Sequence, residues 1–476
     1  MNKSEPNHPK SLRIFFATEM WERYGFYVVQ TLLTLYLVLH FKWPDKQVYA
    51  LVGSFTALAY LSPLLGGWIA DQLLGQKRVI LLGALLLLFS YLALSLAQSY
   101  YFLNLSLAGI AVGTGLLKPN ISSLLGNEYP EGSPHRENGF MIFYMGLTAG
   151  IVLGTTLPSY LNEQFGWSLA FMSASAGMVI ATSIFSFGIY WYRMNDYVKH
   201  TFQFKNTLLA SALIFLLWLA SFYILNYPTL ADAVFSIVTL LSVAYFIMCV
   251  RSEDTTQARK TLALGLLFLI AIMFWAFYFQ IFLSLTLFVL RVAQPTLFGA
   301  SFPPPYYVGI ESIGMILLGF LLIYRKTQLD KVQQGIRVAN NFLGAMCIIT
   351  VAYIYIVLIC HVGSPMGLLS PLYIIPAYLM ISLAEMLLSP VGLSAVTMLA
   401  SRKKVSTLMG IFFATIGVGA FLSGKLAALT AVSAQEVNLK AHYASSFGKL
   451  LIILSISTLI CVILNYIVKR LIRRSE

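Results

Sequence analysis

Long apolar stretches alternate with short polar segments along the whole chain of 476 residues. Fourteen of these stretches reach about 20 residues, the length that an α-helix needs to cross a bilayer. We place these spans at residues 12–40, 47–74, 77–97, 101–125, 136–161, 168–192, 207–225, 231–250, 261–290, 305–324, 336–358, 371–400, 405–430 and 447–470. The pattern predicts an all-α protein that crosses the membrane many times.

The composition leaves too few polar side chains for a soluble protein of this length, because 59% of the residues are hydrophobic and only 10% are charged. The net charge of +13 does not indicate nucleic-acid binding, since the Lys and Arg residues gather in alternate loops and not in one patch. This bias is typical of cytoplasmic loops and predicts that both termini are cytoplasmic. The four cysteines lie in apolar spans without metal-site spacing, so we expect no metal.

The first apolar span contains three ionisable residues, Glu19, Glu22 and Arg23. Their spacing of i, i+3 and i+4 places them on one face of a helix. A charge inside the hydrocarbon region costs about 2.5–3.5 kcal/mol on insertion scales, so the cluster should face a protein interior or a cavity and bind a proton or a substrate. The alternative is that Glu19 and Arg23 extend to the cytoplasmic surface of the membrane.

The end of the second span, Gly66–Arg78, resembles the G-x-x-x-D-x-x-x-G-x-K/R loop of the major facilitator superfamily. Its glycines allow close helix approach and a tight reversal. We expect Asp71 to pair with Arg78 or a helix terminus and so to act as a conformational latch. The resemblance implies two six-helix halves with a substrate site between them.

The chain has fourteen predicted spans, two more than the twelve helices of the major facilitator fold. The pair at 207–225 and 231–250 lies where the halves would be joined, so we interpret it as an inserted hairpin outside the transport core. The predicted domains are an N-terminal six-helix bundle at 1–200, a linker with the hairpin at 201–255, and a C-terminal six-helix bundle at 256–476.

Several motifs in order resemble the proton-dependent oligopeptide transporters, the peptide branch of the superfamily. They are Glu19–Tyr27, Ser54–Pro63, Gly113–Asn120, Phe143–Gly150 and Glu385–Ser394. The resemblance implies a symporter that imports di- and tripeptides with protons by alternating access, in the bacterial inner membrane and without a cofactor. We expect a monomer whose partners are small peptides, protons and the lipid bilayer.

The resemblance also implies roles for individual residues. Glu19, Glu22 and Arg23 would couple transport to protons, Lys118 would bind the peptide carboxylate, and Glu385 would bind its ammonium group from the opposite wall of the cavity. The other predicted substrate-binding residues are Tyr27, Gln30, Tyr60, Thr148, Trp275, Phe279, Glu311, Phe412 and Phe413. For each aromatic residue, a place in the core is the alternative.

The chain departs from the family pattern at four of these positions. Gln30 stands where the family usually has arginine, and Phe279 where it usually has glutamate, so a charge pair that can close the outer gate is absent. If only one of these two charges were absent, the other would be buried without a partner, and the absence of both avoids that cost. Thr148 replaces an asparagine, and Glu311 stands where an asparagine tends to contact the peptide ammonium.

Glu311 admits three interpretations. As an extra anion it would favour cationic substrates. It could instead replace the missing carboxylate as a proton site, or it could lie at the cavity mouth without either role.

The function also has alternatives. The same fold could carry another amino-bearing solute, or the protein could be a peptide sensor without net transport. An enzyme is not expected, because the chain shows no nucleophile elbow, metal-ligand cluster or phosphate loop.

Overall fold

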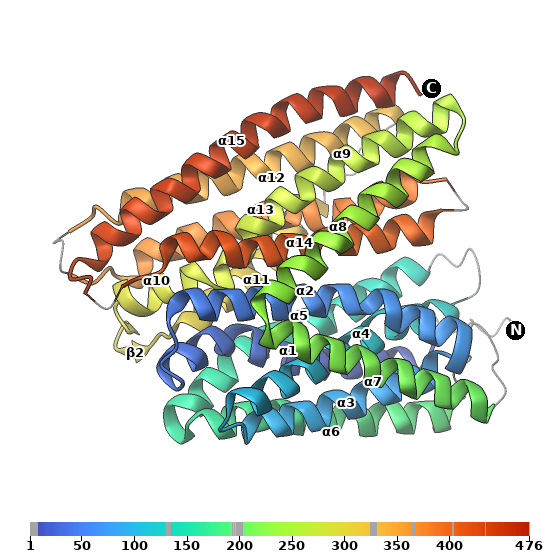
Figure 1. Ribbon diagram of the computed structural model, residues 1–476, viewed down its shortest axis with the longest axis horizontal. Helices are drawn as coiled ribbons and strands as arrows, with labels where there is room; N and C mark the ends of the chain where they lie inside the picture. The colour runs from blue at the N-terminus through green and yellow to red at the C-terminus, as the bar shows by residue number, and fades with distance from the viewer. Residues whose placement is uncertain are drawn as a thin grey trace, which may run out of the picture. The chain divides into compact units, whose positions relative to one another are not determined.

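The computed structural model describes residues 8–129, 135–192, 194, 196, 203–323, 331–363, 367–401, 404–433 and 435–475. Parts of three predicted basic loops, at 193–205, 325–337 and 402–404, lie outside these residues. By their contacts the residues form two compact units, Met1–Leu33 with Leu58–Pro228, and Thr34–Ala57 with Thr229–Glu476. The elements follow one another from the blue to the red end of the chain (Figure 1).

The first part of the chain contains seven α-helices and a π-helical segment, η1. They are α1 Leu12–Leu39, α2 Asp45–Ile69, η1 Ala70–Leu74, α3 Gln76–Ser95, α4 Tyr100–Asn127, α5 His135–Phe165, α6 Trp167–Tyr192 and α7 Phe204–Asn226.

The second part contains eight α-helices, two 3-10 segments and a small hairpin of two-residue strands. They are α8 Pro228–Arg251, α9 Thr255–Tyr278, η2 Phe279–Phe282, α10 Ser284–Val292, β1 Thr296–Leu297, β2 Ala300–Ser301, α11 Pro304–Ile323, α12 Lys331–Ile359, α13 Pro371–Leu399, α14 Val405–Ala427, η3 Ala428–Thr430 and α15 Leu439–Arg473.

The predicted all-α architecture is confirmed. Because α9 and α10 form one span, the described chain has fourteen long helical segments. Twelve spans among the described residues are long and apolar enough to cross a membrane. The first helix, α1, is not one of them, since Glu19, Glu22 and Arg23 make its middle polar.

Glycines bring the helices of the first unit into close contact. Gly146, Gly150 and Gly154 repeat every four residues on α5 and face the backbone of α1, where a Cβ atom on Gly150 would lie 2.2 Å from the carbonyl oxygen of Met20. Such stripes of small residues let membrane helices approach closely. The stripe therefore fixes α5 against the turn of α1 that carries the ionisable cluster.

A second close contact joins α2 to α4. A Cβ atom on Gly66 would lie 2.0 Å from the carbonyl oxygen of Gly115. The side-chain amide of Asn120 donates to the carbonyl oxygens of Gly66 at 3.1 Å and Leu116 at 2.7 Å. A Cβ atom on the adjacent Gly67 would meet no described atom within 4 Å, so the two glycines differ sharply in their surroundings.

The predicted span at 261–290 is interrupted in the second unit. After α9 the backbone tightens into η2, and Leu283 leaves the helical region with φ −119° and ψ −102°. The side-chain amide of Gln280 donates to the Ser423 carbonyl oxygen at 2.8 Å, and the Thr34 hydroxyl donates to the Phe282 carbonyl oxygen at 2.6 Å. The Phe282 carbonyl oxygen at the break and the Gln280 amide next to it therefore both have hydrogen-bond partners, as polar groups require in a lipid environment.

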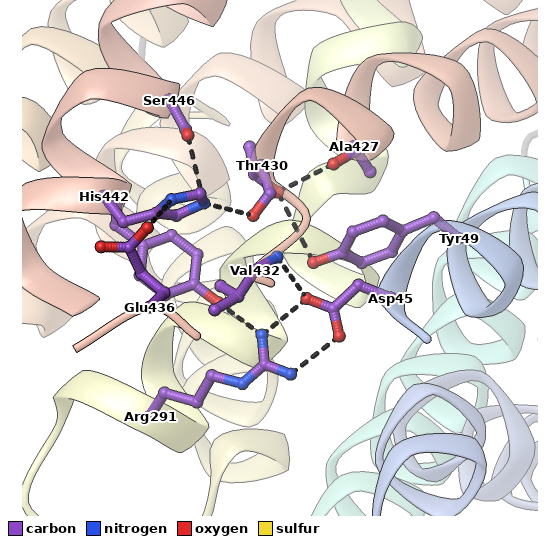
Figure 2. A network of polar contacts seen from close by, with 10 residues as sticks. Asp45, Tyr49, Arg291, Ala427, Thr430, Val432, Glu436, His442 and Ser446 are labelled. Atoms are coloured by element: carbon purple, nitrogen blue, oxygen red, sulfur yellow. Dashed lines mark hydrogen bonds and ion pairs between the residues drawn. The ribbon is translucent and has the colours of Figure 1, made fainter. Parts of the chain in front are cut away.

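A polar network connects the end of α10 to the start of α2 within the second unit (Figure 2). The Arg291 guanidinium donates to both carboxylate oxygens of Asp45, at 2.7 Å each, and to the Tyr443 hydroxyl at 3.0 Å. Asp45 also accepts from the backbone N–H of Val432 at 2.9 Å. These donors surround one carboxylate, so Asp45 ties together segments that are far apart in sequence.

The two arms of the predicted inserted hairpin belong to different units. On α7, the Trp218 indole N–H donates to the Leu105 carbonyl oxygen of α4 at 2.9 Å. On α8, Asp232 lies 2.5 Å from the Lys425 ammonium nitrogen of α14. Each arm is therefore packed against the unit to which it belongs, while the predicted domain boundaries stay a prediction.

We expect the two neighbouring glycines of α2 to respond oppositely to the same substitution. Gly66→Ala forces a methyl group into the backbone of α4, and overpacking of this kind costs about 1–3 kcal/mol. Gly67→Ala should leave the thermal unfolding temperature in detergent unchanged or raise it, because alanine favours the helix. Equal unfolding temperatures for the two variants would show that the close contact does not limit stability.

Removing the partner of Asp45 should also destabilise the protein. Asp45 keeps only 4% of its side chain exposed, and Arg291 keeps 20%. Arg291→Gln leaves this carboxylate without its countercharge, which typically costs about 3 kcal/mol. Thermal unfolding in detergent measures the loss, with Lys46→Gln, an exposed residue on the same turn of α2, as the control. An Arg291→Gln protein as stable as the control would contradict the role of the network.

Candidate functional site

The ionisable cluster of α1 is buried and internally paired. Glu19 and Arg23 are each 2% exposed, and Glu22 is fully buried. The Nη2 atom of Arg23 donates to Glu22 Oε1 at 2.7 Å, and its Nε atom lies 3.4 Å from Glu19 Oε1. This geometry excludes the alternative that Glu19 and Arg23 extend to the membrane surface. The Oε2 atom of Glu19 has no hydrogen-bond partner among the described residues.

Lys118 of α4 belongs to the same electrostatic group. It lies close enough to Glu19, Glu22 and Arg23 to interact with all three. Its ammonium nitrogen lies 5.0 Å from the centre of the Tyr60 ring, in the range of a cation–π contact. The first unit thus gathers two acids and two bases whose formal charges cancel.

The other predicted site residues of the first unit differ in their contacts. Tyr27 lies one turn after Arg23 and interacts with it electrostatically, and Gln30 is buried. The Thr148 hydroxyl donates to the Tyr144 carbonyl oxygen of its own helix at 3.0 Å. This bond occupies the hydroxyl proton, so Thr148 could offer a substrate only its acceptor lone pairs.

The second unit contains a pair of carboxyl groups. Glu311 of α11 and Glu385 of α13 lie close enough for their carboxyl groups to interact with each other. The Tyr278 hydroxyl of α9 donates to Glu385 at 2.8 Å, and the Ser312 hydroxyl donates to Glu311 at 3.2 Å. Glu311 is only 2% exposed, which argues against a residue at an open cavity mouth.

Aromatic rings pack next to this pair. The Trp275 ring centre lies 5.1 Å from that of Tyr278 and 5.6 Å from that of Phe279. Among the described residues, the buried indole N–H of Trp275 has no hydrogen-bond partner. A buried donor of this kind can serve a peptide carbonyl oxygen.

Phe412 and Phe413 of α14 differ in their surroundings. Phe412 is buried against α13, where a Cβ atom on Gly392 would lie 2.4 Å from its ring. Its ring centre is 6.0 Å from that of Phe268 on α9. These contacts favour the core alternative for Phe412, whereas Phe413 is half-buried.

Two predicted pairings stay predictions. Lys118 lies in the first unit and Glu385 in the second, and the geometry within each unit does not test whether they face each other. In the first turn of α3, Lys77 Nζ lies 3.8 Å from Asp196, and the Arg78 guanidinium approaches the Leu74 carbonyl oxygen of η1 at 3.5 Å. The contact between Asp71 and Arg78 is likewise not established.

Sequence reasoning missed Tyr278 as the partner of Glu385, and it missed the pairing of Asp45 with Arg291. Tyr278 did carry a signal, because it lies one turn after Trp275 in an apolar span. Asp45 and Arg291 are 246 positions apart and carried none. Among the described residues, no group of three or more His, Cys, Asp or Glu side chains could hold a metal ion.

Comparisons with known proteins agree with these features. The model of the POT family matches residues 77–444. The chain is 30% identical over 435 residues to "Dipeptide and tripeptide permease A" of Yersinia pestis, covering 90% of this chain and 86% of that protein. It is 30% identical over 456 residues to the protein of the same name from Erwinia pyrifoliae, covering 93% and 90%.

Solved structures show the same fold. A crystal structure of the peptide transporter POT in complex with sulfate superposes with a TM-score of 0.83 at 24% identity, covering 98% of this chain and 96% of that one. Tetrameric PepTSo2 superposes with a TM-score of 0.84 at 24% identity, covering 97% and 99%. The predicted major facilitator architecture with its inserted hairpin is thereby confirmed.

Proposed function

The chain belongs to the POT family, and from that premise we propose that it imports di- and tripeptides together with protons by alternating access. The family consists of peptide transporters that cross the membrane many times and are not enzymes, so these predictions are confirmed. Proton coupling and the roles of the site residues are the proposed part. The names of the relatives support di- and tripeptides as the substrates.

The charge balance of the first unit is the observation that carries the coupling. Glu19, Glu22, Arg23 and Lys118 cancel one another when no substrate is bound. A peptide carboxylate that binds Lys118 adds one negative charge to this buried group. Protonation of one glutamate restores neutrality, and a neutral group is far less costly to enclose away from water. Proton and peptide therefore bind most favourably together.

Glu19 is the better placed of the two glutamates to take that proton. Glu22 keeps two hydrogen bonds to the Arg23 guanidinium, whereas Glu19 has an oxygen without a partner among the described residues. Protonating Glu19 leaves the bonds between Arg23 and Glu22 in place. Arg23 itself keeps its charge, since a guanidinium does not deprotonate in proteins.

The second unit would hold the other end of the peptide. Glu385 offers a carboxylate oxygen to the peptide ammonium while the Tyr278 hydroxyl fixes its orientation. The Trp275 indole N–H is available for a peptide carbonyl oxygen. Lys118 and Glu385 would then bind the two charged ends of one substrate, which is how a short zwitterionic peptide is distinguished from a single amino group.

The remaining parts of the proposal follow from the sequence. Cytoplasmic termini are proposed from the distribution of basic loops. The monomeric state stays a prediction, and one structural neighbour is tetrameric. A preference for cationic peptides requires an ionised Glu311 and also stays a prediction. Neither another amino-bearing solute nor a sensor without transport is favoured by a specific contact.

We expect Glu19→Gln to uncouple transport. In proteoliposomes with an inward acid gradient, the variant should no longer accumulate a labelled dipeptide, because no proton can bind at this position. It should still exchange internal for external dipeptide, since Arg23 retains Glu22. Glu163→Gln, at an exposed glutamate near the end of α5, is the control. Concentrative uptake by Glu19→Gln would rule out this residue as the coupling site.

The two ends of the peptide can be tested separately. Lys118→Met should weaken binding of a dipeptide while leaving binding of its C-terminal amide unchanged. Glu385→Gln should weaken binding of the dipeptide while leaving binding of its N-acetyl form unchanged. Losing a hydrogen bond to a charged group costs about 1.5–3 kcal/mol, or about 10–100-fold in affinity. Isothermal titration calorimetry measures these changes, with exposed Lys449→Met as the control. Equal losses for both modified peptides would refute the assignment of ends.

A further inference from the structure

The carboxyl pair of Glu311 and Glu385 has a property that the proposed peptide site does not require. Glu385 accepts a hydrogen bond from the Tyr278 hydroxyl, while the Ser312 hydroxyl shares its one proton between Glu311 at 3.2 Å and the Val308 carbonyl oxygen at 3.1 Å. The two carboxyl groups also lie close enough to interact with each other, and the buried Oε1 atom of Glu311 has no hydrogen-bond partner among the described residues. Ionised carboxylates only accept hydrogen bonds, so the two groups could bond to each other only with a proton on one of them.

The side chains packed around the pair provide hydroxyl groups. Tyr278 comes from α9, Tyr307 from α11 and Tyr378 from α13, and the rings of Tyr307 and Tyr378 lie 5.4 Å apart. Tyr353 of α12 donates its hydroxyl proton to the Phe277 carbonyl oxygen at 3.0 Å. These groups are neutral, so none of them cancels a second negative charge on the pair.

On α10, α12 and α14 of this unit, the described cationic side chains are engaged elsewhere or exposed. Arg291 of α10 binds Asp45, Lys425 of α14 pairs with Asp232, and Arg337 of α12 is exposed. Within the described part of the unit, the groups that interact with Glu311 include Glu385, Ser312 and Tyr378, and none of these is a cation. Two adjacent carboxylates without a cation repel each other strongly, and a shared proton removes that repulsion.

We propose that Glu311 and Glu385 share one proton and form a second proton-binding site of the transporter, in the unit that does not contain the Glu19 cluster. The inference rests on the proposed function, because it assigns the proton to the site that binds the peptide ammonium. The pair with its proton carries one negative charge, and an ammonium group cancels that charge. The complex of pair, proton and peptide ammonium is therefore neutral.

This charge count decides between two interpretations of Glu311. A proton on the pair leaves one negative charge for one ammonium group, so no excess anion remains to select a cationic side chain. Loss of the proton would leave the buried complex with an uncompensated charge, which is costly to enclose. The proton would accordingly be on the pair before the peptide binds and would cross the membrane with it, and neutral and lysine-containing dipeptides should bind alike at the pair.

The shared proton can be detected without transport. Infrared difference spectra of the purified protein at neutral pH should show the carbonyl-stretch band of a protonated carboxyl group in the wild type. Glu311→Gln should lose this band, because the amide N–H then donates to Glu385 in place of the proton. Ser312→Ala keeps both carboxyl groups and should keep the band. Identical spectra for wild type and Glu311→Gln would refute the shared proton.

Transport stoichiometry tests the coupling. The number of protons per dipeptide, obtained from the membrane potential and pH gradient that stop net flux in proteoliposomes, should fall by one in Glu311→Gln. Exposed Glu163→Gln should keep the wild-type ratio. An unchanged ratio in Glu311→Gln would overturn the coupling role.

The two readouts separate this inference from the proposed function. If the wild type takes up no dipeptide, the proposed function fails, and the infrared band still shows whether the pair shares a proton. If the wild type transports and Glu311→Gln selectively loses lysine-containing peptides, Glu311 is an ionised selectivity residue and the shared proton is refuted.

Discussion

The permanent charge of Arg23 is the constraint on which the first unit depends. A guanidinium cannot give up its proton, so a buried arginine must be neutralised by other groups. Glu22 and Glu19 do this from the same helix face, and Lys118 of α4 then needs the remaining negative charge. The charge of Arg23 therefore constrains how many acidic and basic side chains can be buried around it. Any change in charge there, by a proton or by a substrate carboxylate, must be compensated.

The second unit meets the same constraint by other means. Two of its buried acids, Glu311 and Glu385, lie close together without a described cation beside them, and the hydroxyl groups of Ser312 and Tyr278 contact them. In our proposal, a proton and the ammonium group of a substrate neutralise this pair. The first unit would then balance its charges with fixed side chains, and the second with groups that bind and leave. A zwitterionic peptide fits this division, since its two ends carry opposite charges.

Close packing makes these balances sensitive to helix position. Gly150 of α5 lets the backbone of α1 approach so closely that a methyl group would collide with it. In the second unit the interruption at Leu283 divides one span into two, and Gln280 and Thr34 supply partners around the break. The chain has no charge at Gln30 or Phe279, and within the second unit Asp45 pairs with Arg291.

The sequence by itself determined the helices and the grouping of charges along each of them. A long apolar segment must form a helix in the membrane, because lipid offers no hydrogen-bond partner to the backbone N–H and C=O groups. The spacing of Glu19, Glu22 and Arg23 fixes their common face because a helix repeats every 3.6 residues. The motifs also indicated the family, which the comparisons confirmed.

Tertiary structure decided which charged groups meet across helices. Glu311 is 74 positions from Glu385, and no periodicity relates a residue of α11 to one of α13. The same holds for Tyr278 with Glu385 and for Asp45 with Arg291, whose distances depend on how whole helices pack. The protonation of Glu311 depends in turn on its neighbours. For this reason the sequence left its role open between a selectivity charge and a proton site, and only the packing of α9, α11 and α13 favours one of them.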